Sequence, residues 1–306
     1  MKQAASHSHH HHMDGPAFSA LGVLMLVWGY NWVVMKIALR YAAPLDFAAL
    51  RTFFASLLLL LPVLIWQRRA LLPRRILPVL VLGFLQTACF VGLVNIALVH
   101  GGAGKSSVLV YTMPFWVALL APLVLREHFR RSQLPALVLA FAGLLLIIAP
   151  WQQRPDLVSS LLALTAGFMW ALSVLVVKSI RIGSTWELLA LTGWQMLFGS
   201  LILIALAVLV PSHPIHWTGT FILALLYNIG PGNALAWFLW LFIVNRLPAS
   251  VSGLNALAIP IVGVLAGWLQ LGERPGPTEA VGMLLVFAAL TLLALSMRRR
   301  PAVQRS

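Results

Sequence analysis

Long apolar runs, separated by short segments rich in Arg, Pro and Gly, fill almost the whole chain. The hydrocarbon core of a bilayer is about 30 Å thick, and an α-helix needs about 20 apolar residues to cross it. Ten runs come close to that length, and the loops between them are too short for a separate soluble domain. The predicted membrane spans are residues 18–39, 45–66, 76–98, 103–125, 134–150, 157–179, 187–210, 219–244, 249–270 and 279–297.

Composition favours the same fold class. Hydrophobic residues make up 61% of the chain and charged residues 9%, whereas soluble domains contain about 45–50% apolar and about 25% charged residues. A formal charge of +14 would indicate a nucleic-acid partner if it formed one basic face of a soluble domain. Here the basic residues cluster between the apolar runs. We therefore expect an all-α membrane protein with ten transmembrane helices, a lipid bilayer around it and no nucleic-acid partner.

Lys and Arg are distributed unevenly between the two sets of loops. Ten spans place both termini on one face, where the loops and tails carry 15 Lys and Arg residues. The opposite face carries 4, and Lys36 and Arg51 are assigned to helix ends. Because short cytoplasmic loops carry an excess of positive charge, the pattern predicts a multi-pass protein of the bacterial inner membrane with both termini in the cytoplasm.

The chain divides into two halves that share landmarks in the same order. Residues 1–16, with histidines at 9–12, are interpreted as an expression tag or a disordered leader. A first half at 17–152, a second half at 153–298 and a cytoplasmic tail at 299–306 follow. The landmarks are pairs eight residues apart, Trp28 with Lys36 and Trp170 with Lys178, and pairs thirteen apart, Pro114 with Glu127 and Pro260 with Glu273.

A half with five spans must enter the membrane from the face opposite to the other half. The fold is therefore predicted to consist of two inverted five-helix repeats. Inverted repeats are typical of alternating-access transporters, whose binding site lies where the repeats meet near the midplane. The alternative is a duplication that serves packing alone.

Two prolines are predicted to interrupt equivalent helices. Pro114 and Pro260 lie near the middle of the fourth and ninth spans. A proline inside a helix removes one hydrogen bond and frees the carbonyl four residues before it. Backbone freed at bilayer depth must be satisfied by protein, water or a ligand. We interpret the two prolines as paired hinges, and a plain kink is the alternative for each.

The eighth span contains a stronger interruption, Gly230, Pro231 and Gly232, between Asn228 and Asn233. Two glycines around a proline weaken a helix, so these three residues are added to the predicted hinges. The matching stretch of the third span, 83–87, has no Gly-Pro-Gly. The sequence therefore favours an asymmetric interruption that serves substrate recognition.

Aromatic and amide side chains inside the spans form a candidate binding site. Ligand cavities are largely apolar, with a few placed polar groups, and amides and freed carbonyls suit the two charges of a zwitterion. Core packing and interhelical hydrogen bonds are the alternatives for each residue. The predicted cavity residues are Trp28, Asn31, Tyr111, Trp170, Asn228, Asn233, Trp237 and Asn255.

The seven acidic residues all map to termini, loops or helix ends. Proton-coupled carriers often use a buried carboxylate or histidine as a relay, so facilitative transport is expected. Cys89 is a single cysteine, and no arrangement of residues indicates a metal site, a nucleotide loop or a catalytic triad. We expect no cofactor, no metal and no enzyme activity.

Three stretches of the chain resemble a known family. They are Trp28-Gly29-Tyr30-Asn31 leading to Lys36, Pro44 leading to Leu50-Arg51, and Pro114 leading to Glu127. The pattern is similar to that of the EamA-type drug/metabolite transporter superfamily, and within it to amino-acid exporters of the YddG type. The resemblance implies a ten-helix basket in which spans 1, 2, 6 and 7 move against 3, 4, 8 and 9, with 5 and 10 peripheral.

The resemblance also implies an exporter of amino acids, aromatic ones included, and we expect an exporter of aromatic and other neutral amino acids that is a monomer. The sequence departs from two-fold symmetry where Arg51 aligns near Thr192 and where the eighth span has its Gly-Pro-Gly. One alternative is an exporter of drugs or cationic metabolites, which would be expected to use a buried carboxylate. Another is a membrane assembly subunit that binds a partner protein.

Overall fold

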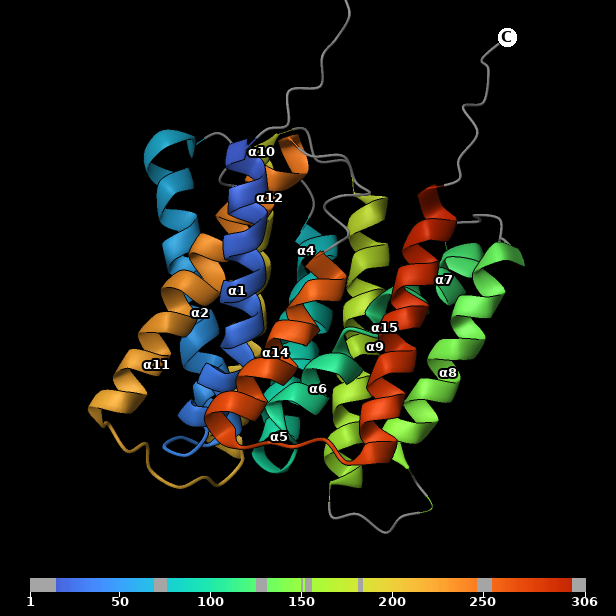
Figure 1. Cartoon of the computed structure of the whole chain (residues 1–306). Helices are drawn as coiled ribbons and strands as arrows, with labels where there is room; N and C mark the ends of the chain where they lie inside the picture. The colour runs from blue at the N-terminus through green and yellow to red at the C-terminus, as the bar shows by residue number, and fades with distance from the viewer. Residues whose placement is uncertain are drawn as a thin grey trace, which may run out of the picture.

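The computed structural model describes residues 15–68, 76–124, 131–149, 151, 156–180, 184–246 and 255–298, and every regular element within them is helical (Figure 1). The first half contains α1 (Gly15–Ala38), α2 (Pro44–Trp66), α4 (Ile76–Leu82), η1 (Gly83–Cys89), α5 (Phe90–His100), α6 (Ala103–Val110), α7 (Met113–Val124), η2 (Arg131–Gln133) and α8 (Leu134–Ile148). The second half contains α9 (Leu157–Ser179), α10 (Thr185–Leu209), α11 (Gly219–Ile229), η3 (Gly230–Leu235), α12 (Ala236–Arg246), α14 (Asn255–Leu271) and α15 (Pro277–Arg298).

The predicted spans correspond to these helices. Among the described residues, nine helical segments are long and apolar enough to cross a bilayer. The shorter apolar helix Ala258–Leu271 belongs to the ninth predicted span. The part of that span at 249–254, the leader up to residue 14 and the tail at 299–306 lie outside the described residues. The all-α membrane fold is thus confirmed.

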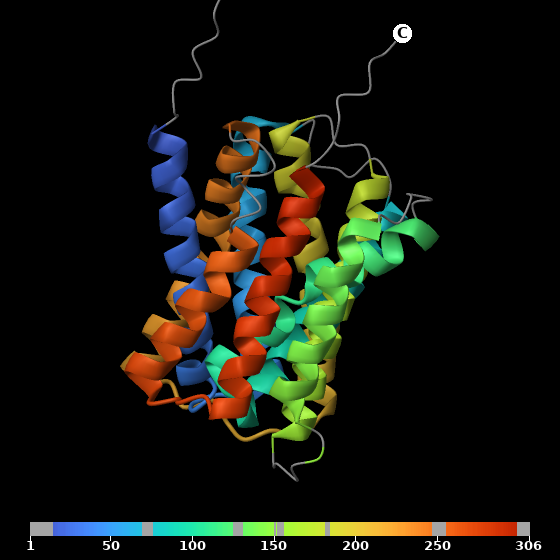
Figure 2. The same ribbon diagram turned by 45° about the vertical axis from the view of Figure 1, so that its right-hand side comes forward.

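The two halves run in opposite directions through the bundle. We call the face where α1 begins and α15 ends the terminal face (Figures 1 and 2). α1 starts at this face, whereas the first helix of the second half, α9, starts at the opposite face (Figure 1). The inverted repeat follows from this arrangement, because each half contributes five spans.

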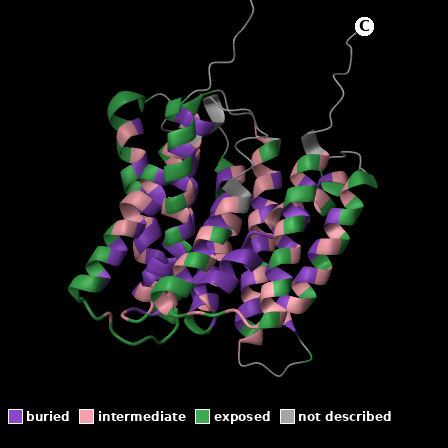
Figure 3. Ribbon diagram, in the orientation of Figure 1, coloured by how far each residue is buried: buried purple, intermediate pink, exposed green. Residues whose placement is uncertain are grey.

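Helices from the two halves pack against each other along the bundle. α2 packs along α10, α1 along α14, and α5 along α9. Buried residues gather in the interior of the bundle, while many apolar residues on the outer helix surfaces remain exposed (Figure 3). An exposed apolar surface of this kind suits contact with lipid. All eight residues of α6, in contrast, are buried.

Both halves contain a π-helical segment, called a wide turn below, which corrects the asymmetry predicted between the third and eighth spans. The residues at 230–235 form η3, and those at 83–89 form η1, with Gly83 and Gly230 starting the two segments 147 residues apart. η1 contains no proline, and it packs closely against α10: a Cβ on Gly83 would lie 2.8 Å from the carbonyl oxygen of Gln195. Irregular backbone is tolerated at membrane depth where protein buries it. The interruption therefore belongs to the shared scaffold.

The two matched prolines lie in different local structures. The fourth span breaks at residues 111–112, just before Pro114, and Thr112 Oγ1 donates to the carbonyl of Leu109 at 2.6 Å. Pro260 lies inside α14, which is continuous over its described length. Within the described residues, the helix break near the matched proline therefore occurs in the first half and not in the second. The role of Pro114 and Pro260 as hinges stays a prediction.

The fifth and tenth spans, α8 and α15, form a pair at one side of the bundle (Figures 1 and 2). Gly143 and Gly282 bring their backbones together: a Cβ on Gly143 would lie 2.8 Å from the Gly282 carbonyl oxygen, and one on Gly282 would lie 2.7 Å from the Gly143 carbonyl oxygen. Small residues allow such close helix approach in membranes.

We predict that Gly143→Leu destabilises the protein, because the new side chain must separate α8 from α15. Overpacking typically costs about 1–3 kcal/mol. Thermal unfolding of the purified protein in detergent measures the loss. Gly22→Leu is the matched control, since nothing lies within 4 Å of a Cβ at this exposed position of α1. Equal melting temperatures for Gly143→Leu and the parent would contradict the packing described.

Candidate cavity between the two halves

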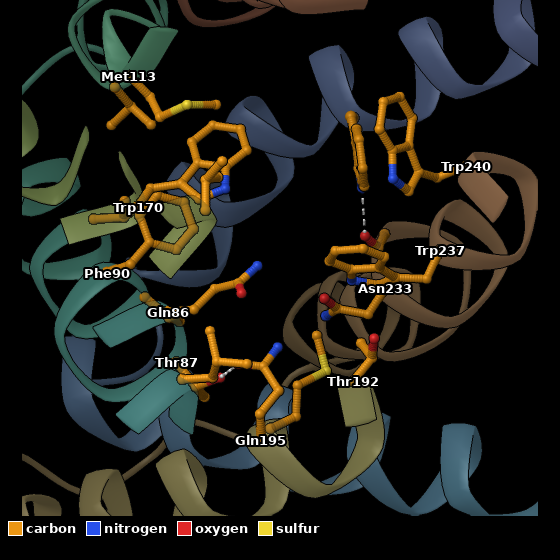
Figure 4. A pocket seen from close by; sticks show the side chains of 18 of the residues that line it. Gln86, Thr87, Phe90, Met113, Trp170, Thr192, Gln195, Asn233, Trp237 and Trp240 are labelled. Atoms are coloured by element: carbon orange, nitrogen blue, oxygen red, sulfur yellow. Dashed lines mark hydrogen bonds between the residues drawn. The ribbon is translucent and has the colours of Figure 1, made fainter. Parts of the chain in front are cut away.

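A cavity of about 560 Å³ lies where the two halves meet (Figure 4). Its size falls within the range of about 300–1,000 Å³ that is usual for small-molecule sites. Side chains from α1, α2, η1, α5, α9, α10, η3 and α12 line it, so both repeats contribute. The lining extends along α9 to Lys178, which lies near the helix end at the terminal face.

One wall of the cavity is aromatic and comes from α5, α9 and the break in the fourth span. The rings of Phe90 and Trp170 are 5.3 Å apart, tilted by 38°. Tyr111 meets Trp170 edge to face at 5.3 Å. Tyr111 is held at the break between α6 and α7, where its N–H donates to the carbonyl of Ser107. We call Phe90, Tyr111 and Trp170 the first aromatic wall.

A second aromatic wall, Trp28, Trp237 and Trp240, lies across the cavity from the first (Figure 4). Trp28 meets Trp237 edge to face at 6.0 Å and lies 6.3 Å from Trp240. The indole Nε1 of Trp28 donates to the carbonyl oxygen of Gly232 at 3.0 Å. The wide turn of η3 therefore fixes the orientation of a wall residue on α1.

The two walls are related by the repeat. Phe90 and Trp237 are 147 residues apart, and Trp28 and Trp170 are 142 apart. In the first wall, Phe90 follows the wide turn η1 of the first half and contacts Trp170 on α9, the first helix of the second half. In the second wall, Trp237 follows η3 of the second half and contacts Trp28 on α1, the first helix of the first half. The inverted duplication thus places equivalent pairs on opposite sides of one cavity.

Neutral polar side chains lie between the walls, along one side of the cavity (Figure 4). Thr87 Oγ1 and Gln195 Oε1 are 3.5 Å apart, which joins η1 to α10. Asn233 Nδ2 donates to the carbonyl of Asn228 at 2.6 Å across the wide turn. The cavity combines aromatic faces with amides and hydroxyls. The neutral polar residues on this side are Gln86, Thr87, Thr192, Gln195 and Asn233, and the amide of Asn31 on α1 also belongs to the lining.

Arg51 belongs to the cavity lining, which corrects its assignment to a helix end. Its side chain is 6% exposed within α2. Nη1 donates to Asn228 Oδ1 at 2.7 Å and contacts the Met35 sulfur. Sequence reasoning missed this residue, although an arginine inside an apolar run is itself a signal of function.

Most of the predicted site residues meet at the cavity. Asn228 lies behind Arg51, fully buried and outside the lining, and the side chain of Asn255 lies outside the described residues. Among the predicted hinge residues, Gly232 lines the cavity, whereas Pro114 and Pro260 do not. The predicted residues that do line it are Trp28, Asn31, Tyr111, Trp170, Asn233 and Trp237. Across the described residues, no three His, Cys, Asp or Glu side chains gather in a metal-binding group.

Charged groups close the bundle at the face opposite the termini. Glu273 accepts hydrogen bonds from the backbone N–H groups of Ala103 and Gly104 at 2.9 and 3.1 Å. Lys36 Nζ donates to the carbonyl of Gly101 at 2.8 Å and to that of Val99 at 3.1 Å. The anion meets the N-terminus of α6 and the cation meets the C-terminus of α5, so both stabilise helix dipoles. We call this arrangement the clamp.

Comparisons with known proteins agree with the duplicated fold. The family model of the EamA-like transporter family matches the chain twice, at residues 17–149 and 157–295. A solved crystal structure superposes with a TM-score of 0.65 at 18% identity, covering 93% of this chain and 99% of that one, and it shows likeness of fold alone.

Curated relatives are similar over most of their length. The uncharacterized transporter YvbV of Bacillus subtilis is 30% identical, over 89% of this chain and 90% of its own. YoaV of the same organism is 26% identical, over 92% and 98%. The probable amino-acid metabolite efflux pump of Escherichia coli is 26% identical, over 92% and 96%. With a family match that covers both halves and a cavity built by both, the chain belongs to the EamA-like transporter family of the drug/metabolite transporter superfamily.

Proposed function

We propose that the protein exports amino acids, aromatic and other neutral ones, across the bacterial inner membrane by alternating access. The observation that carries the proposal is the cavity between the inverted halves, with two aromatic walls and a polar side between them. Aromatic faces suit an aromatic side chain, and amides and hydroxyls suit the charged backbone groups of an amino acid. The name of the Escherichia coli relative, an amino-acid metabolite efflux pump, supports the same substrate class.

The proposed transport cycle uses the two ends of the cavity in turn. The lining extends toward the terminal face at Lys178, while the clamp closes the opposite end. With both termini in the cytoplasm, this is a cytoplasm-facing state. In the other state the clamp opens and α6 moves away from α14. Because the halves are inverted copies, an equivalent movement of the second half closes the terminal face.

The cavity chemistry disfavours the alternatives. Among the described lining residues the charged side chains are Arg51 and Lys178, both cations, and no carboxylate is present. An exporter of cationic drugs would bind its substrate against this positive charge. No carboxylate relay faces the solute either, so we propose that the solute gradient alone drives transport. An assembly subunit has no need of a cavity with two aromatic walls.

We predict that both aromatic walls contribute to substrate affinity. In liposomes containing the purified protein, counterflow of labelled phenylalanine should show a KM raised about 2- to 10-fold by Trp237→Ala and by Phe90→Ala, because each removes an aromatic contact. Phe238→Ala is the control, since Phe238 neighbours Trp237 but is 57% exposed on the outer surface. Absence of exchange for every amino acid tried, with protein that remains folded, would contradict the proposed function.

We predict that weakening the clamp exposes the closed end. Glu273→Gln removes the charge that faces the N-terminus of α6 and keeps the shape of the side chain. Ser106, buried on α6, is replaced by cysteine in a Cys89→Ala background. Its labelling rate by an impermeant maleimide added outside intact cells should rise several-fold with Glu273→Gln. Asp46→Asn is the control, because this carboxylate lies at the same end and accepts a hydrogen bond from the exposed Ser212. Equal rates in all variants would exclude Glu273 as a gate residue.

We predict the membrane orientation from the distribution of basic residues. Alkaline phosphatase fused after Arg298 should be inactive because it stays in the cytoplasm, whereas a fusion after Pro214, in the exposed connection between α10 and α11, should be active. Enzyme activity in whole cells gives the readout, and a fusion of green fluorescent protein at each position should give the opposite pattern. High phosphatase activity at Arg298 would reverse the assigned topology.

A further inference from the structure

Arg51 is a buried cation deep in the membrane part of the protein. It lies seven residues after Pro44, the first residue of α2, which places it about 10 Å along the helix. Its side chain is 6% exposed and lines the cavity. A charge at membrane depth is costly, and such residues usually face a cavity and mark a substrate pathway.

The described partners of Arg51 are all neutral. Nη1 donates to Asn228 Oδ1 at 2.7 Å, and Asn228 Nδ2 donates in turn to the carbonyl of Ala224, which fixes the amide with its oxygen toward the guanidinium. The ring of Phe47 lies 5.8 Å from the guanidinium carbon. No described carboxylate is within ion-pairing distance of Arg51, and its buried Nε has no hydrogen-bond partner. A guanidinium has five N–H donors, so hydrogen-bonding capacity and a full charge remain.

The position of Arg51 makes one side of the buried cavity positively charged. Lys178, the second cation among the described lining residues, is exposed near the terminal face, so Arg51 is the charge in the buried part. Its counterpart in the second half is Thr192, 141 residues later, which also lines the cavity. The aromatic residues of the walls therefore have equivalents in both halves, whereas the charge of Arg51 has none at the equivalent position. A solute with one anionic end therefore has one favoured orientation between the walls.

We propose that Arg51 anchors the carboxylate of the solute, and that this carboxylate is the charge the carrier selects. The inference rests on the proposed function and adds a substrate class to it: aromatic monocarboxylates, with or without an amino group. A guanidinium binds a carboxylate through short, charge-assisted hydrogen bonds, often two at once. Asn228 acts as a positioning residue that holds the guanidinium through Nη1.

The test compares three probes of similar shape: phenylalanine, 3-phenylpropionate and the neutral 3-phenylpropanamide. Quenching of intrinsic tryptophan fluorescence reports binding to the detergent-purified protein, because five tryptophans line the cavity. We expect the parent to bind 3-phenylpropionate about tenfold or more tightly than the amide, and within a few-fold of phenylalanine. Preference for the amide over the carboxylate in the parent would overturn the proposal without any variant.

Substitutions then separate anchoring from a merely structural role. Arg51→Gln should reduce the carboxylate-to-amide affinity ratio to near one while amide binding and monodispersity persist. Arg51→Lys should keep part of the preference for the carboxylate over the amide, because lysine keeps the positive charge but lacks the planar set of N–H donors that binds both carboxylate oxygens. Arg40→Gln, which removes an exposed cation of the same half, should leave the ratio at the parent value. Equal weakening of all three probes by Arg51→Gln would overturn the proposal in favour of a structural role.

Failure of the proposed function gives a different result. If liposomes with the parent exchange no amino acid, yet 3-phenylpropionate binds in a manner that depends on Arg51, the carboxylate site stands and amino acids are the wrong cargo. If phenylalanine is exchanged and the affinity ratio is the same in Arg51→Gln and the parent, the transport proposal stands and the carboxylate site is wrong.

Discussion

A bilayer offers no water to a backbone N–H, a carbonyl or a charge, so every such group at membrane depth must find its partner within the protein. This constraint explains where irregular structure occurs in the bundle. The wide turns η1 and η3 and the break before Pro114 all lie at the contact between the halves, where other helices surround them. The outer helices α8 and α15 show no such interruption over their described lengths, and they pack through two glycines. The seam between the halves is thus the place where backbone and side chains are free to form a polar cavity.

Symmetry and its loss have separate roles in that cavity. The aromatic walls are equivalent pairs, Phe90 with Trp170 and Trp237 with Trp28, and they rest on wide turns that occur in both halves. In the proposed transport cycle, two equivalent walls would present the same apolar surface to a solute whichever end of the cavity is open. Arg51 breaks the equivalence because its counterpart is Thr192. A carrier that used walls alone would distinguish solutes by shape, whereas a single buried guanidinium adds a choice by charge.

The clamp depends on the same constraint at a helix end. The turn between α5 and α6 carries the unpaired carbonyls of one helix and the unpaired N–H groups of the next. Lys36 from α1 meets the first set and Glu273, which follows α14, meets the second. One turn in the first half is therefore held by two other segments, one of them from the second half. Such a contact is well suited to a gate, since a relative movement of the halves breaks several hydrogen bonds together.

The amino-acid sequence by itself determined the spans, the fold class and the duplication, and it pointed to six of the residues that line the cavity. Hydropathy is local, and one apolar run of the right length is enough to predict a span. Trp28, Trp170 and Trp237 were found because they recur in the repeat or neighbour a clear helix breaker. Other features were decided only by the tertiary structure. An arginine inside an apolar run signals function, but the neighbouring sequence does not tell what it faces, and Arg51 meets Asn228 across 177 residues. The wide turn in the third span was missed because its cause is not a proline in the segment. The segment packs against α10 at Gly83, and which helices approach each other depends on the packing of the whole bundle.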